Sequence, residues 1–170
     1  ACLEELRRCS GTQFDPKIVD AFVKVLQRLE RRRAVGTAAA CAGALAVDPD
    51  AWIAADRQRD ASSADYLSAA AALRAARDAH PPTRFLTAVS REDDRFVIIV
   101  DPEEAPEAWS PCGKEVVGTL GFAEALAGEA LDSVVLHVDG NGVWVNAVAP
   151  VNDAHGERFG LVCATVPAEA

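Results

Sequence analysis

TRFLTAVSREDDRFVIIV, residues 83–100, decides the fold class of this 170-residue chain. Its two halves, residues 83–90 and 94–100, are rich in β-branched and aromatic residues with a period of two, which is typical of strands. The charged segment REDD that joins them has the composition of a turn. We therefore expect a β-hairpin here, directly after Pro81-Pro82 ends a helical segment.

Three further strands are expected toward the C-terminus, at residues 132–138, 142–151 and 158–166. Asn141-Gly142 has the composition of a hairpin turn between the first two of them. Before them lies a proline-rich loop, followed by residues 119–128, which predict a short helix ended by a glycine. The pattern predicts an α+β fold with a five-stranded antiparallel sheet.

The first half of the chain has helical periodicity instead. Asp15 before Pro16 is a strong helix start, and no firm break occurs before residues 48–50, so one helix is expected from Pro16 to Val47. Its first half carries an apolar stripe of Ile18, Phe22, Val25 and Leu29. Its second half, residues 34–47, is too short and too rich in Ala and Gly to span a membrane, and we expect it to be buried through small residues.

Two shorter helices should follow the long one. Asp48-Pro49 starts the first, and Ser63 can cap the second. The expected buried side of the second consists of Tyr66, Leu67, Ala70 and Leu73.

Charge and motif content exclude several classes of function. Residues 1–33 have a net charge of +3 and residues 34–170 a net charge of −12, which argues against a nucleic-acid surface. The five cysteines are scattered, without the spacing of a zinc site or a disulfide framework. No phosphate-binding glycine loop, nucleophile elbow or His-x-x-x-His pair occurs, so we expect no catalytic residue, no metal and no cofactor.

Two strings carry a resemblance to a known family. "LRAARDAHPPTRFLTAVSREDDRFVIIVDPEEAPEAWSPCGKEV" and "VDGNGVWVNAVAPVNDAHGERFGLVCATV" resemble the opening and closing hairpins of bacterial Cache and PAS sensor domains. The resemblance covers about residues 36–170. It implies a PAS-like sheet at residues 83–170 behind a helical lead-in at 34–82, and, because no spanning helix precedes it, a cytoplasmic location without membrane contact.

The first 30 residues resemble a different family. "EELRRCSGTQFDPKIVDAFVKVL" is similar to the C-terminal end of HD-GYP domains, which hydrolyse cyclic di-GMP at a metal centre of His and Asp residues. The chain contains neither a His-Asp dipeptide nor a Gly-Tyr-Pro sequence. The resemblance therefore implies that residues 1–33 are the tail of a truncated HD-GYP-like domain together with a connecting helix.

Six residues are candidates for binding a small molecule: Phe85, Thr87, Asp101, Trp109, Trp144 and Asn146. Trp144 and Asn146 share one face of a strand, where they could hold a small polar molecule or belong to the core. Trp109 could form a lid or simply fix its own loop. Asp101 could bind an amine or cap backbone N–H groups.

His137 and Asp139 should also share a face. The histidine is either a heme or metal ligand or, as we expect, a residue of the sheet surface.

The sequence thus predicts a non-catalytic sensory module of a bacterial signalling protein. We expect an unidentified small-molecule ligand, a homodimer formed through the N-terminal helices and an adjacent signalling domain, such as a cyclic di-GMP phosphodiesterase. The alternatives are a ligand-free dimerisation module and a fragment of a metal-dependent phosphohydrolase.

Overall fold

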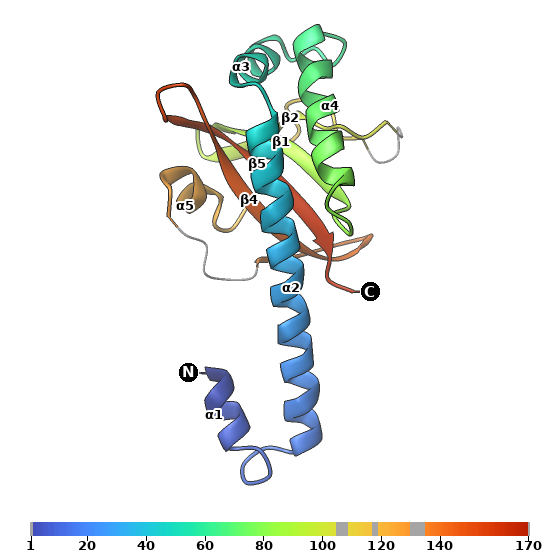
Figure 1. The fold of residues 1–170 in the computed structure, drawn as a ribbon, viewed down its shortest axis with the longest axis vertical. Helices are drawn as coiled ribbons and strands as arrows, with labels where there is room; N and C mark the ends of the chain where they lie inside the picture. Colours follow the sequence, from blue (N-terminus) through green and yellow to red (C-terminus); the bar gives the residue numbers. More distant parts are fainter. Residues whose placement is uncertain (1, 105–108, 117–118, 130–134, 170) are drawn as a thin grey trace.

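The computed structural model describes residues 2–104, 109–116, 119–129 and 135–169. It confirms the α+β class, with one five-stranded antiparallel sheet in the order β2-β1-β5-β4-β3 (Figure 1). The strands are β1 (Phe85–Glu92), β2 (Arg95–Val100), β3 (Val135–Asp139), β4 (Gly142–Asn152) and β5 (Arg158–Pro167). The first three residues predicted for the third strand, 132–134, lie outside the described residues.

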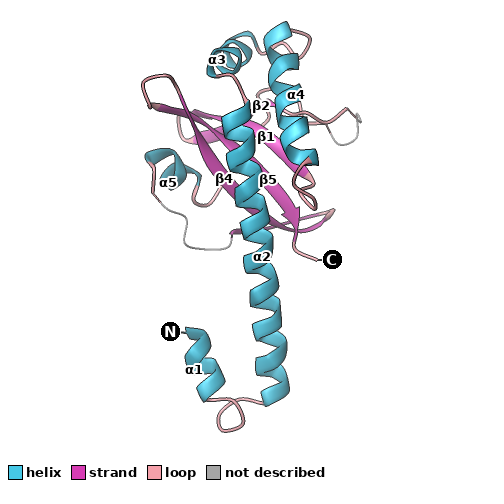
Figure 2. Cartoon of the chain, in the orientation of Figure 1, coloured by secondary structure: helices cyan, strands magenta, loops and turns pink. Residues whose placement is uncertain are grey.

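The helices are α1 (Cys2–Arg8), α2 (Pro16–Ala46), α3 (Pro49–Gln58), α4 (Ala64–Asp78) and α5 (Phe122–Ala127). The predicted caps are confirmed, because the side chains of Asp15, Asp48 and Ser63 accept hydrogen bonds from the first turns of α2, α3 and α4. The helix α1 was not predicted from the sequence. Figure 2 shows how this helix precedes the long α2, which runs beside the magenta sheet.

The second half of α2 packs on one face of the sheet through small residues, as predicted. Gly36, Ala39, Ala40 and Gly43 are buried there. A Cβ atom at Gly43 would lie 3.0 Å from Val162 Cγ1, so a side chain at this position would press against the side chains of the sheet, and glycine allows the helix its close approach. In the part of the chain that the structure describes, no helix is long and apolar enough to cross a membrane.

The first half of α2 extends beyond the sheet, and α1 folds back beside it (Figure 1). Val19 and Val23 are buried in this part of the helix. Ile18, Phe22 and Val25 of the predicted stripe are exposed, Ile18 to 68%.

The helix α4 packs beside α2 and against the sheet. Tyr66, Ala70 and Leu73 are buried as predicted, but the prediction for Leu67 was wrong, since its side chain is 56% exposed. The buried residues of α4 repeat every three or four positions, so Leu67 falls one position outside the buried face.

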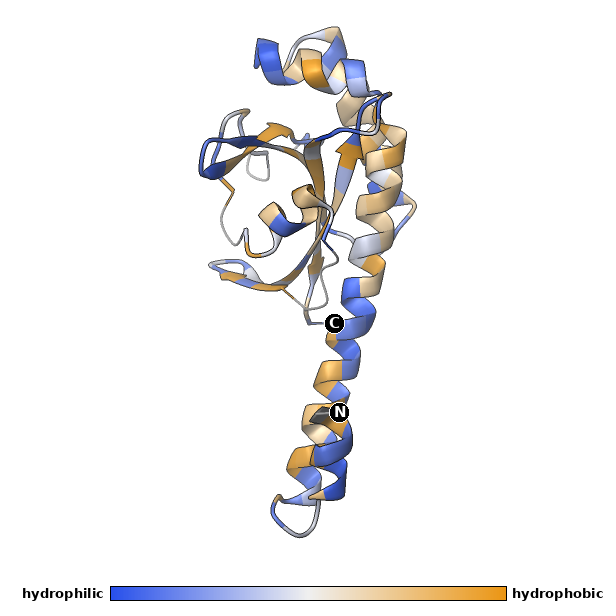
Figure 3. Cartoon of the chain, turned by 90° about the vertical axis from the view of Figure 1, so that its left-hand side faces the viewer, coloured by the Kyte–Doolittle hydropathy of each residue, from blue (hydrophilic) through white to orange (hydrophobic). Residues whose placement is uncertain are grey.

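The helix α5 covers the opposite face of the sheet, and Figure 3 shows the sheet between α5 and α2. Phe122 and Ala125 of α5 pack on Val89, Phe96 and Leu161. This cluster fills only one end of that face, and the other end holds the candidate site.

Candidate ligand-binding cavity

Strand register brings polar residues together on the sheet face that α2 does not cover. Thr165 of β5 pairs with Phe85 of β1 on one side and with Asn146 of β4 on the other. Thr87 pairs with Cys163, one step further along the same face. Because side chains alternate along strands, these residues form two adjacent rows on one surface.

All six candidate residues from the sequence line one cavity of about 300 Å³ on this face. The cavity is also lined by Ile98, Ser110, Lys114, Glu115, Val116, His137, Asp139, Asn141, Cys163 and Thr165. This volume is at the lower end of the range for metabolite sites. The cavity is therefore large enough for a small metabolite.

Asp101 is a buried carboxylate at the end of β2. Its Oδ1 accepts a hydrogen bond from Glu103 N at 3.0 Å, and its Oδ2 accepts one from Ser110 N at 2.8 Å. The capping role considered from the sequence is therefore present. Burial raises the pKa of Asp101 above the usual range of an aspartate, although both backbone N–H groups act in the opposite direction.

The hydroxyl group of Tyr66 on α4 forms hydrogen bonds with Trp109 and with the backbone of Asp101. The Nε1–H group of Trp109 donates to the Tyr66 hydroxyl oxygen at 3.3 Å. The same hydroxyl donates to the carbonyl oxygen of Asp101 at 3.0 Å and lies 3.2 Å from the Asp101 amide nitrogen, which donates to it. Tyr66 was predicted as a core residue only, because the sequence pattern of a helix shows which face is buried and not which loop its hydroxyl will meet.

Trp144 forms the wall at the β3–β4 end of the cavity. Its Nε1–H donates to Asp139 Oδ1 at 3.0 Å, and its ring makes an edge contact with Phe85 at 5.8 Å between centroids. The Oδ1 atom of Asp139 also accepts from the backbone N–H groups of Asn141 and Gly142. These donors lower the pKa of Asp139, the indole N–H most strongly.

Asn146 is 8% exposed, and its amide oxygen accepts a hydrogen bond from Thr165 Oγ1 at 3.0 Å. Among the described residues, no hydrogen-bond partner is found for the amide nitrogen of Asn146, which lines the cavity. His137 lies at the cavity rim with Nε2 3.7 Å from Asp139 Oδ2, on the same side of β3 as expected. Within the described ranges, no group of three or more His, Cys, Asp or Glu side chains could hold a metal ion.

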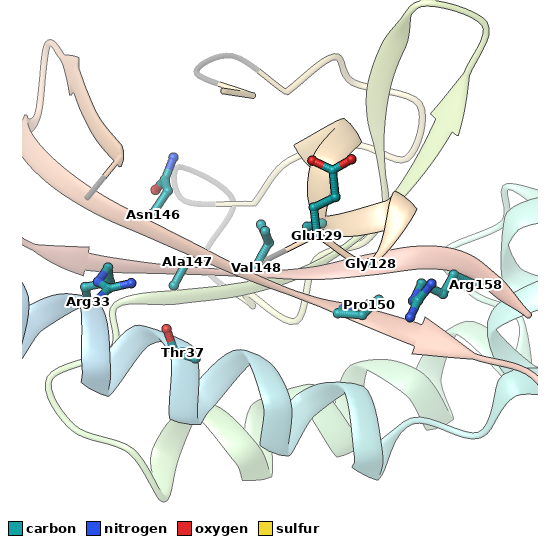
Figure 4. Close-up of a pocket in the computed structure, with 10 residues that line it drawn as sticks. Arg33, Thr37, Gly128, Glu129, Asn146, Ala147, Val148, Pro150 and Arg158 are labelled. Carbon is teal, nitrogen blue, oxygen red and sulfur yellow. The ribbon is translucent and has the colours of Figure 1, made fainter. Parts of the chain in front are cut away.

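A second cavity of about 320 Å³ lies beside β4, between α2 and α5. Pairing of β3 with β4 ends at Asn146, and the cavity follows the part of β4 beyond it. In Figure 4, Asn146 and Glu129 point to one side of β4, whereas Thr37 lies on the α2 side. Because the described residues of its lining are divided between two sides of a strand, they form no convergent set of polar groups.

Neither a scan against protein-family models nor a search of curated proteins finds a match to the chain.

Proposed function

We propose that this chain is a non-catalytic sensory module that binds a small molecule in the cavity on the α5 side of the sheet. One observation carries the proposal: the six candidate residues from four separate parts of the sequence line a single cavity. Aromatic walls with a few convergent polar groups are typical of metabolite sites.

Hydrogen bonds provide a path from the cavity to the helices. Trp109 and Asp101 are both joined to Tyr66, and Tyr66 belongs to α4, which packs against α2. A ligand shifts such a structure only if it binds one arrangement of the helices more tightly than another. We propose that a ligand in contact with Trp109 and Asp101 favours one position of α4 relative to α2 through the hydrogen bonds of these two residues to Tyr66.

We further propose that α2 transmits this change to an adjacent signalling domain in the cytoplasm. The resemblance of residues 1–30 to the end of an HD-GYP domain supports a cyclic di-GMP phosphodiesterase as that domain. The geometry of α2 is compatible with such a link, because its first half projects away from the sensor sheet.

A thermal-shift screen of a metabolite library tests the binding function. A ligand present at 100 times its Kd stabilises the folded state by about 2.7 kcal/mol, which for a domain of this size corresponds to roughly 5–11 °C. Trp144→Leu should abolish the shift, whereas Val138→Thr, an exposed position on the neighbouring strand, should retain it. Failure of every library member to stabilise the wild type would count against the proposal.

A second candidate function, a dimerisation module, is favoured by the exposed apolar side chains of the projecting segment. Phe14, Ile18, Phe22 and Val25 are all exposed in the single chain. A second copy packed on this stripe would remove them from water. Sedimentation velocity should then show a dimer for the wild type and a monomer for the Ile18→Ser, Phe22→Ser double variant; a monomeric wild type at 100 µM, roughly the upper range for specific dimers, would exclude it.

A further inference from the structure

The ionisable groups of the cavity favour a positively charged ligand. Among its described lining residues are three carboxylates, Asp101, Glu115 and Asp139, one ammonium group, that of Lys114, and one imidazole, that of His137. The ammonium group of Lys114 is 3.0 Å from Ser110 Oγ, to which it donates a hydrogen bond. An anion entering the cavity would meet an excess of negative charge in a partly desolvated site, where Coulomb repulsion is stronger than in water.

The aromatic residues of the cavity offer π surface and no free donor. The indole N–H of Trp109 is bonded to Tyr66 and that of Trp144 to Asp139. Their remaining contribution to a ligand is ring surface, which attracts cations through the ring quadrupole. Phe85 makes such a cation–π contact within the chain, since the guanidinium carbon of Arg84 lies 4.7 Å from its ring centroid.

Asp101 retains capacity for a further donor. Each of its oxygens accepts one backbone N–H, whereas a carboxylate offers about four lone-pair sites. Lys114 acts on this buried carboxylate as a counter-charge and Glu103 as a like charge, and a bound cation would add a second counter-charge that offsets the cost of burial. Across the sheet, the amide nitrogen of Asn146 can donate to an acceptor on the same ligand.

We propose that the cavity binds a small organic cation, with its ammonium group between Asp101 and the rings of Trp109 and Trp144. The proposal rests on the sensory function proposed above and specifies the chemical class of its ligand. It applies to primary amines and to alkylated ammonium groups alike, because both are attracted by carboxylates and by π surfaces.

Isothermal titration calorimetry on the full 170-residue chain tests the ligand class with three cationic probes: choline, 2-phenylethylamine and putrescine. The decisive comparison is choline against 3,3-dimethylbutan-1-ol, which replaces the charged nitrogen by carbon at nearly constant shape. We expect at least one of the three cations to bind, and choline, where it binds, to bind at least about tenfold more tightly than its neutral counterpart. Isovalerate, an anion of similar size, should not bind.

Variants distinguish a direct effect of the cavity's charge on ligand binding from an indirect effect through loss of stability. Asp101→Asn should weaken binding of the cation about tenfold or more. Because Asp101 also caps its loop, Glu115→Gln, which alters an exposed carboxylate of the cavity, is the second variant and should weaken binding without changing the thermal midpoint. Glu104→Gln, outside the cavity but in the same acidic loop, should leave binding unchanged.

The outcomes distinguish the two proposals. If neutral or anionic members of the metabolite library bind and the three cations do not, the cationic class is wrong and the sensory function stands. Equal affinity for choline and 3,3-dimethylbutan-1-ol would overturn the class in the same way. If nothing in the library binds, the sensory function itself fails.

Discussion

Tyr66→Phe is the most direct test of the link between the cavity and the helices. The substitution removes one oxygen atom and keeps the buried ring. It leaves the carbonyl oxygen of Asp101, the amide N–H of Asp101 and the indole N–H of Trp109 without their common partner. No other contact of the ring needs to change, so the effect reports on the hydroxyl alone.

The loss of stability depends on how deeply each group that loses its hydrogen-bond partner is buried. Trp109 is 37% exposed, so its indole N–H can bond to water after the substitution at little cost. The backbone groups of Asp101 are in a residue that is only 4% exposed, and an unsatisfied buried polar group costs about 1–3 kcal/mol. We therefore expect Tyr66→Phe to lower the free energy of unfolding by about 2 kcal/mol, equivalent to about 4–8 °C in Tm.

Urea unfolding followed by circular dichroism measures this change. Leu67→Ala is the matched control, because Leu67 is the next residue of α4 and is exposed; it should change the free energy by less than about 0.5 kcal/mol. A loss below about 0.5 kcal/mol for Tyr66→Phe would refute the reasoning, since it would mean that the hydroxyl does not hold the loop. The same variant should weaken ligand binding if Trp109 must be positioned by Tyr66.

Three further predictions concern packing, pH and thiol reactivity. Gly43→Val should destabilise the fold by about 1–3 kcal/mol in urea unfolding, because its Cβ would already press on Val162, whereas Leu45→Ala on the exposed side of the helix should have almost no effect. Since the folded pKa of Asp101 is raised, its contribution to stability is present below the unfolded pKa of about 3.9 and is lost as pH rises through the folded pKa. The free energy of unfolding of the wild type minus that of Asp101→Asn should therefore fall from pH 4 upward, and a rise would contradict the assignment. Burial raises the pKa of the Cys163 thiol to about 12, so iodoacetamide at pH 8 should modify the exposed Cys41 and spare Cys163 in mass spectrometry of the native protein.

Local sequence signals predicted the elements well because each has a local physical cause. Asp15-Pro16 begins α2 in the structure, and the small residues of its second half lie on the sheet. The two segments with a period of two, residues 83–90 and 94–100, correspond to β1 and β2, whose ends differ from the prediction by at most two residues. Capping hydrogen bonds and the periodicity of burial depend on residues that are close together in the sequence, so the sequence can predict them.

The contacts between distant segments could not be predicted in the same way. Nothing in the helical pattern of α4 indicates that the Tyr66 hydroxyl meets Asp101, 35 residues later. The role of Asp139 was also missed, although it follows His137 at the strand spacing and begins the turn that leads to Trp144. Such bonds depend on the registers of two or more elements, which a single sequence does not specify.

The gradient of polarity along one sheet face explains why a cavity forms where it does. At the end covered by α5, the strands present Val89, Leu161 and partly buried Val148, which pack into a closed cluster. Further along the same face, Thr87 lies beside Cys163, which still belongs to the apolar cluster, and the next row presents Thr165 beside Asn146. A helix that buried this second set would have to satisfy their polar groups, at about 1–3 kcal/mol for each one left unpaired. A small polar ligand can satisfy them instead, and it can leave, which a covering helix cannot do without unfolding. The change from apolar to polar residues along three adjacent strands therefore favours a reversible ligand over a permanent structural cover.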